Sequence, residues 1–137
     1  MRPIRLAAFC TGAFCLTMLA LPARAQSYSI TDLGPSSLAT GINGTRAVTG
    51  IADLHAFVYD DATMTDIGTL GGEYSQGQGI NAAGDVAGYA TLADGSYRAF
   101  VYSAGRMVSL GTLGSNYSAA YAINDAGQVV GTSSTAT

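Results

Sequence analysis

The sequence predicts an all-β protein built from antiparallel four-stranded repeat units. Residues 55–89 return as residues 98–132 with a period of 43 and no gap, and 17 of the 35 aligned pairs are identical. After residue 25 no window has the 3.6-residue apolar period of a helix, and glycine interrupts every candidate. Propeller blades have periods of about 40–45 residues. We therefore expect a partial, open β-propeller-like array.

The first 25 residues have the pattern of a helical secretory signal peptide. A start with two arginines is followed by an apolar run over residues 6–21, and Ala23 and Ala25 occupy the positions that a signal peptidase reads. The run of 16 residues is shorter than the roughly 20 that a membrane-spanning helix needs. We expect cleavage after Ala25, a secreted, cell-surface or periplasmic protein, and no membrane span in the mature chain.

The mature chain is acidic and free of cysteine. Cys10 and Cys15 both lie in the predicted signal peptide, so neither a disulfide nor a thiolate metal site is expected after it. Beyond residue 25 there are three arginines and no lysine against eight aspartates and one glutamate, a formal charge of −6. Such a surface repels phosphate backbones, so we expect no nucleic-acid partner.

The mature chain, residues 26–137, begins with a shortened copy of the repeat. The segment 31–34 (Thr-Asp-Leu-Gly) matches the first full copy at an offset of 34, whereas 41–43 (Gly-Ile-Asn) matches at an offset of 38. This copy therefore lacks four residues, and it also lacks the Ala-Phe-Val-Tyr strand. The predicted units are a partial one, 26–54, and two full ones, 55–97 and 98–137.

Each full unit is predicted to hold four short strands. In the first they are residues 56–60, 64–68, 76–80 and 85–91, which are joined by a turn at 61–63, a glycine-rich corner at 69–72 and a hairpin turn at 81–84, with a further turn at 93–96. The hairpin turn ends in glycine, which tolerates positive φ. Residues 56–59 recur unchanged in the second copy, so we expect both faces of that strand to be buried, as in radial blades or a stacked solenoid.

Three blocks of the sequence stand out in order: His55-Ala56-Phe57, residues 64–72 (Met-Thr-Asp-Ile-Gly-Thr-Leu-Gly-Gly) and residues 123–131 (Ile-Asn-Asp-Ala-Gly-Gln-Val-Val-Gly). Together they resemble the HAF family of bacterial extracellular repeat proteins. The resemblance covers essentially the whole mature chain. It implies a β-propeller-like fold and a secreted or surface-associated protein, and it implies no established activity. Members generally carry more repeats. Because repeat arrays usually need about three units, we expect self-association or completion by missing propeller segments.

Two kinds of binding residue stand out. Tyr74 and Tyr117 occupy equivalent positions, and Tyr121 falls in a predicted strand that neighbours the strand of Tyr89. These rings either stack on a glycan or pack in the core or between units. Oxygen-rich turns in an acidic secreted chain either hold calcium or only bond locally. The candidate calcium ligands are Asp60, Asp61, Asp66, Asn124 and Asp125.

No catalytic or cofactor-binding residue is predicted. His55 is the only histidine, and its repeat partner is Arg98, which favours a polar residue that opens a strand over a base or metal ligand. Glycoside hydrolysis would need a carboxylate pair such as Glu73 with an aspartate, but most of the carboxylates lie in or beside turns.

The sequence therefore predicts a secreted, non-enzymatic repeat protein that acts as an extracellular interaction or structural module without a required cofactor. The alternatives are a glycan- or calcium-binding propeller fragment, a glycoside hydrolase, and a truncated reading frame without independent function.

Overall fold

The computed structural model describes residues 27–136, so the predicted signal peptide lies outside the described residues. Every strand lies within residues 32–137. Over the described residues the secondary structure is β-strand without any helix, which confirms the all-β prediction. No helix in this part of the chain is long and apolar enough to cross a membrane.

The first sheet is a four-stranded antiparallel meander. Its strands pair in chain order, so each strand lies beside the one that precedes it in the sequence. The strands are β1 (Ser37–Ile42), β2 (Val48–Ala52), β3 (His55–Asp60) and β4 (Thr63–Asp66). The tight turn between β3 and β4 places Asp61 and Ala62 at φ values of 45° and 64°. Two successive positive φ values give the twist that a two-residue hairpin requires.

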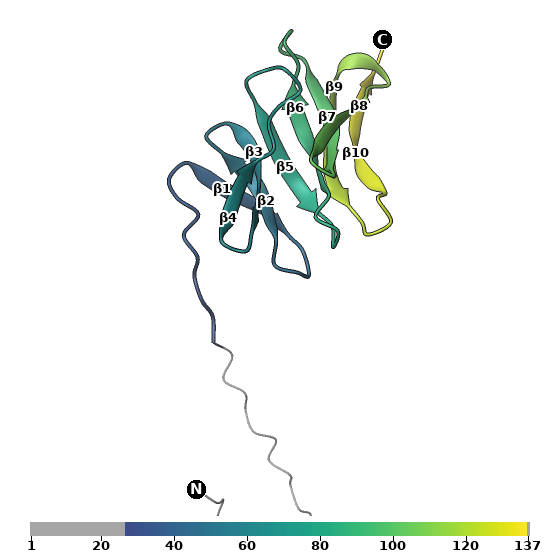
Figure 1. The fold of residues 1–137 in the computed structure, drawn as a ribbon. Helices are drawn as coiled ribbons and strands as arrows, with labels where there is room; N and C mark the ends of the chain where they lie inside the picture. The colour runs from purple at the N-terminus through teal and green to yellow at the C-terminus, as the bar shows by residue number, and fades with distance from the viewer. Residues whose placement is uncertain (1–26, 137) are drawn as a thin grey trace, which may run out of the picture. The chain divides into compact units, whose positions relative to one another are not determined.

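The second sheet repeats this order and then adds a hairpin (Figure 1). Its strands are β5 (Ser75–Ile80), β6 (Val86–Thr91), β7 (Tyr97–Ser103), β8 (Arg106–Gly111), β9 (Gly114–Ile123) and β10 (Val129–Thr135). Strands β5 to β8 pair antiparallel in chain order. The β9–β10 hairpin joins them through one parallel pair, Tyr97 with Tyr117.

The four strands predicted for the first full unit correspond to β3, β4, β5 and β6, with ends that differ by no more than two residues. The sheets, however, divide the chain half a unit away from the boundaries of the sequence repeat. The first sheet combines β1 and β2, from residues 26–54, with β3 and β4 of the next unit. The glycine-rich corner at 69–72 is where the chain leaves one sheet for the next.

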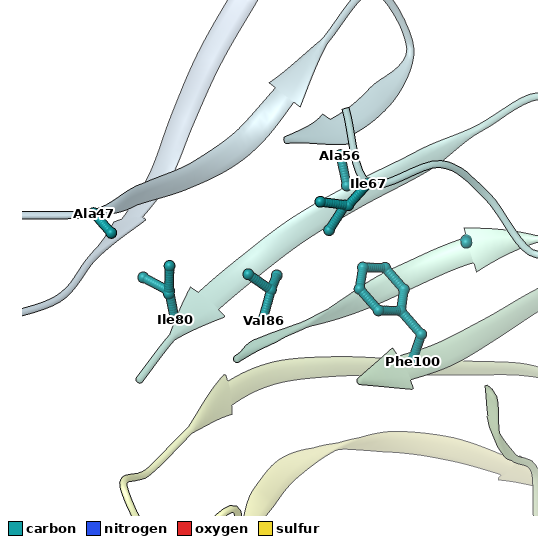
Figure 2. Close-up of a cluster of buried hydrophobic side chains, with 7 residues drawn as sticks. Ala47, Ala56, Ile67, Ile80, Val86 and Phe100 are labelled. Atoms are coloured by element: carbon teal, nitrogen blue, oxygen red, sulfur yellow. The ribbon is translucent and has the colours of Figure 1, made fainter. Parts of the chain in front are cut away.

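The main core forms around Phe100. Its ring points from β7 toward Val86 and Ile67, and the cluster extends to Ala56, Ile80 and the alanines 47 and 90 (Figure 2). The core thus joins side chains of the first sheet and the corner after it to side chains of the second.

The prediction that both faces of the strand at 56–60 are buried holds at its start. Ala56 is fully buried and Phe57 is 1% exposed, although consecutive residues of a strand point to opposite faces. Val58 and Tyr59 are half-buried. The same pattern recurs in β7, where Ala99 and Phe100 are buried.

At two corners of the chain, between β4 and β5 and between β8 and β9, a serine of the strand after the corner makes two equivalent hydrogen bonds. Ser75 Oγ accepts a hydrogen bond from the Ala56 N–H at 2.8 Å and donates to the Gly68 carbonyl at 2.5 Å. Forty-three residues later, Ser118 Oγ accepts from the Ala99 N–H at 2.9 Å and donates to the Gly111 carbonyl at 2.6 Å. The shortened copy keeps the second bond, from Ser37 Oγ to the Gly34 carbonyl at 2.7 Å.

Asparagines at the hairpin turns form a second recurring link. Asn43 Nδ2 donates to the Asn81 carbonyl at 2.8 Å, and Asn81 Nδ2 donates to the Asn124 carbonyl at 3.2 Å. Asn124 Nδ2 donates within its own turn, to Gln128 Oε1 at 2.8 Å. This asparagine ladder fixes the spacing of the turns that lie at one end of β1, β5 and β9.

Removal of one of these serine hydroxyls should destabilise the protein more where the hydroxyl is buried than where it is exposed. Ser75→Ala leaves the N–H of the fully buried Ala56 without its acceptor, and we expect a loss of about 2 kcal/mol in the free energy of unfolding. Ser37→Ala removes a bond in an exposed turn and should cost less than about 0.5 kcal/mol. Urea unfolding of both variants checks this order, and equal losses would contradict it.

Three equivalent turns place a residue at positive φ, and one of them does so without glycine. Arg46 has φ +75°, whereas the matching positions hold Gly84 at +86° and Gly127 at +75°. A side chain costs roughly 1 kcal/mol in this region. A Cβ on Gly127 would meet no atom within 4 Å, so that position reports backbone strain alone.

We expect Gly127→Arg to lower the free energy of unfolding by about 1 kcal/mol and Arg46→Gly to raise it by up to about 0.5 kcal/mol, because glycine also frees the unfolded chain. Both values come from urea unfolding curves. If Gly127→Arg left the free energy of unfolding unchanged, the turn would not impose this conformation.

Candidate functional site

Five tyrosines gather over the second sheet and line a pocket of about 330 Å³ together with Gln78. Tyr74 precedes β5, Tyr89 lies in β6 and Tyr97 begins β7, while Tyr117 and Tyr121 lie in β9. Tyr74, Gln76 and Gln78 share a face because side chains alternate along a strand. We call the five tyrosines the tyrosine pocket.

The rings of the tyrosine pocket form a connected chain. Tyr74 stacks on Tyr89 with ring centroids 6.0 Å apart and an interplanar angle of 26°. Tyr97 lies 6.3 Å from Tyr74 and 6.0 Å from Tyr89 at steeper angles, and Tyr117 lies 6.1 Å from Tyr97. Stacked and tilted pairs at these distances hold one another in place. The pocket is therefore preformed.

Gln76 holds the inner end of this arrangement. Its Oε1 accepts hydrogen bonds from the hydroxyls of Tyr74 at 2.7 Å and Tyr89 at 2.8 Å. Gln76 is 9% exposed and lies directly opposite Tyr89 in the β5–β6 pairing. Because one buried oxygen accepts both phenol protons, the two inner rings are fixed in orientation as well as in position.

The outer rings remain open to solvent. Tyr97, Tyr117 and Tyr121 are 38%, 36% and 50% exposed. The Arg98 guanidinium lies beside them and donates to the carbonyls of Tyr97 at 2.9 Å and Asn116 at 2.8 Å. A ligand can thus reach aromatic faces and hydroxyls without any rearrangement of the strands.

The phenol at the centre of the tyrosine pocket, Tyr89, stays uncharged well above neutral pH. Burial, followed by the neighbouring hydroxyls of Tyr74 and Tyr97, raises the pKa of Tyr89 to about 12. The pKa of Tyr117 is also raised, first by hydrogen bonding with Tyr121 and then by burial. These phenols therefore act as neutral hydrogen-bonding groups rather than as bases or anions.

The structure brings together the predicted stacking residues Tyr74, Tyr117 and Tyr121, and adds Tyr89, Tyr97 and Gln76. Tyr97 was not predicted because its repeat partner is Leu54, so the repeat comparison gives it no weight. Only the tertiary structure identifies Tyr97, because its parallel pairing with Tyr117 places it beside the other tyrosines of the pocket.

The candidate calcium ligands are spread over separate turns. Asp60 and Asp61 lie at the β3–β4 turn, whereas Asp66 lies opposite Phe57, about 10 Å away along the strand. Asn124 and Asp125 lie at the β9–β10 turn, where Asp125 Oδ1 accepts from the Ala82 N–H at 2.8 Å. Among residues 27–136, no three His, Cys, Asp or Glu side chains are grouped to hold a metal ion.

His55 pairs with a carboxylate across the β3–β4 hairpin. Its Nδ1 lies 2.8 Å from Asp66 Oδ2, and Asp66 Oδ1 accepts from the Gly68 N–H at 2.7 Å. Burial raises the pKa of Asp66, but the bonds from His55 and Gly68 outweigh it and the pKa is lowered. A glycosidase acid needs the opposite shift. Glu73, the other candidate, is exposed at the glycine-rich corner.

The raised pKa of Tyr89 predicts a loss of stability at alkaline pH. The folded state holds the phenol proton more tightly than the unfolded chain, whose tyrosines ionise near pH 10.0. The stabilisation is therefore complete below about pH 10 and disappears as pH rises toward about 12. We expect Tyr89→Phe, which cannot ionise, to lose less stability over this interval. Urea unfolding midpoints between pH 9 and pH 12 test this, and parallel curves for the two proteins would contradict it.

Comparisons of the chain with family models, with curated proteins and with solved structures found no match. The resemblance to the HAF family therefore stays a prediction from the sequence motifs.

Proposed function

We propose that the chain is a secreted, non-enzymatic repeat module of the HAF type that binds carbohydrate in the tyrosine pocket. The single observation that carries this proposal is the pocket itself, in which five tyrosines and Gln78 surround a space of about 330 Å³. Binding sites of this kind combine aromatic surface with a few placed polar groups.

The chemistry of the pocket suits a neutral sugar. A pyranose presents apolar C–H faces, which pack on tyrosine rings, and equatorial hydroxyls, which exchange hydrogen bonds with phenols and amides. The half-exposed rings of Tyr97 and Tyr117 offer the faces, while the Tyr121 hydroxyl and the Gln78 amide offer the polar contacts. Neutral phenols suit an uncharged ligand better than an anion.

The lining of the pocket favours binding over hydrolysis. Glycoside hydrolysis needs two carboxylates about 5–10 Å apart around the sugar. The residues that line the tyrosine pocket include tyrosines and one glutamine but no aspartate or glutamate. This supports a binding role for the site.

The recurring serine bonds and the asparagine ladder support the open, propeller-like arrangement that we propose for the units. Strand β5 contacts β1, β2 and β3 of the first sheet, and β9 contacts β5, β6 and β7 in the same way. Successive units thus stack through equivalent strands, which is how radial blades are arranged. We infer that the tyrosine pocket spans two neighbouring units of this array.

A glycan array with the purified protein tests the proposal. We expect binding to neutral glycans that survives chelation, because no calcium ligand lines the pocket. In titrations with the best glycan, Tyr97→Ala and Tyr117→Ala should each weaken binding by about 5- to 10-fold. Tyr28→Ala, at a tyrosine that is 83% exposed outside the pocket, is the matched control and should leave binding unchanged.

Absence of glycan binding both with and without a chelator would refute the proposal. Binding that chelation abolishes would instead favour a calcium-dependent site, and binding that Tyr117→Ala leaves intact would place the glycan site outside the tyrosine pocket.

A further inference from the structure

A second, more apolar groove of about 300 Å³ lies between the corner that joins β8 to β9 and the strand β10. Its walls are Leu110 and Leu113 on the corner side and Val129 and Ser133 on β10, with Ala99 of β7 between them. We call this space the β10 groove. It is separate from the tyrosine pocket and shares no residue with it.

The walls of the β10 groove repeat the residues that enclose Phe100. Shifted by 43 positions, the cluster around Phe100 coincides with the groove at five places: Ala56 with Ala99, Ile67 with Leu110, Leu70 with Leu113, Val86 with Val129, and Ala90 with Ser133. Four of these five pairs are apolar in both copies. The groove is therefore a second socket of the shape that Phe100 fills in the first (Figure 2).

The exposure of the walls shows that the second socket is unfilled in the described part of the chain. Ile67 is 7% exposed beside Phe100, whereas its counterpart Leu110 is 50% exposed and Leu113 is 70% exposed. A cavity of roughly 150 Å³ already accepts a benzene ring, so the β10 groove has room for a phenyl side chain.

The floor of both sockets is a glycine. Gly88 pairs with Phe100, and the Phe100 ring lies 2.9 Å from the point where a Cβ on Gly88 would stand. Gly131 occupies the same position in β10, and its backbone packs under the Ala119 carbonyl as that of Gly88 packs under the Gln76 carbonyl. Glycine leaves the floor open for a ring in both places.

Strand β10 also has a free edge. Its antiparallel partner is β9 on one side, and no described strand lies on the other, where β7 lies beside β6 in the preceding copy (Figure 1). Unpaired backbone groups on such an edge accept a further strand. The β6–β7 register, moved by 43 residues, would set a phenylalanine opposite Gly131 and an alanine opposite Thr132.

We propose that the β10 groove is a docking site for an extended partner strand of the Ala-Phe-Val-Tyr type, which pairs antiparallel with β10 and inserts its phenylalanine over Gly131. The partner chemistry follows from the filled socket, where Ala99 is followed by Phe100: a small residue opposite Thr132, then an aromatic ring for the apolar walls. Main-chain bonds supply the direction, and the ring supplies the specificity. This site is independent of carbohydrate binding.

A peptide with the sequence of residues 97–111, which comprises the β7–β8 hairpin, is the probe. We expect it to bind the purified protein saturably in fluorescence anisotropy. The same peptide with Phe100→Ala should bind at least about 50-fold more weakly, because a buried phenyl ring is among the largest single contributions to such a contact. Leu113→Asp in the protein should cause a comparable loss by placing a charge in the groove.

Leu38→Asp is the control, since Leu38 is 58% exposed on β1 and lies outside the groove. It should leave peptide binding unchanged, and circular dichroism of both leucine variants shows that they fold. No binding up to millimolar peptide, or equal binding of the Phe100→Ala peptide, would overturn the proposal. Light scattering that shows a dimer dissolved by Leu113→Asp, without peptide binding, would also overturn it, because a second copy would then occupy the groove.

Discussion

The hydroxyl of Ser75 is the interaction on which the joining of the two sheets depends. At the corner between them the chain runs through glycines and has no ladder of strand hydrogen bonds, so buried backbone groups on both sides need a partner. Ser75 satisfies the Ala56 N–H and the Gly68 carbonyl at once. Ser118 does the same at the next corner. These bonds hold the corner closed beside the apolar cluster around Phe100, to which Ala56 and Ile67 belong.

Much of the secondary structure could be predicted from the sequence, since the strands at 55–60 and 86–91 are short, rich in β-branched and aromatic residues, and bounded by turn residues. Glycines at positive φ, such as Gly84 and Gly127, marked their turns correctly. The grouping into sheets was less accessible. A repeat has no natural starting point, and only the pairing of β2 with β3 shows that the turn at Leu54 joins two strands of one sheet and is not a boundary between sheets.

The tyrosine pocket could be predicted only in part. The repeat marks Tyr74 and Tyr117 because both copies keep them, but the pocket also needs Tyr97 and Gln76, which have no equivalent tyrosine or glutamine in the other copy. Their position depends on the parallel contact of β7 with β9, which no local pattern announces. The candidate calcium ligands stay a prediction: a turn aspartate such as Asp61 resembles a ligand in sequence, and among residues 27–136 it belongs to no group of three His, Cys, Asp or Glu side chains.

The meander order of the strands has a consequence for how the chain reaches this structure. Apart from the single parallel pair between β7 and β9, each described strand pairs with the strand next to it in the sequence. Loop closure is then short for each hairpin, whereas each corner closes over a longer stretch of chain, and short closures form faster. We expect hairpins to form first and corners to close afterwards. Such a chain can acquire its shape progressively, one hairpin at a time, while the rest of it is still unfolded.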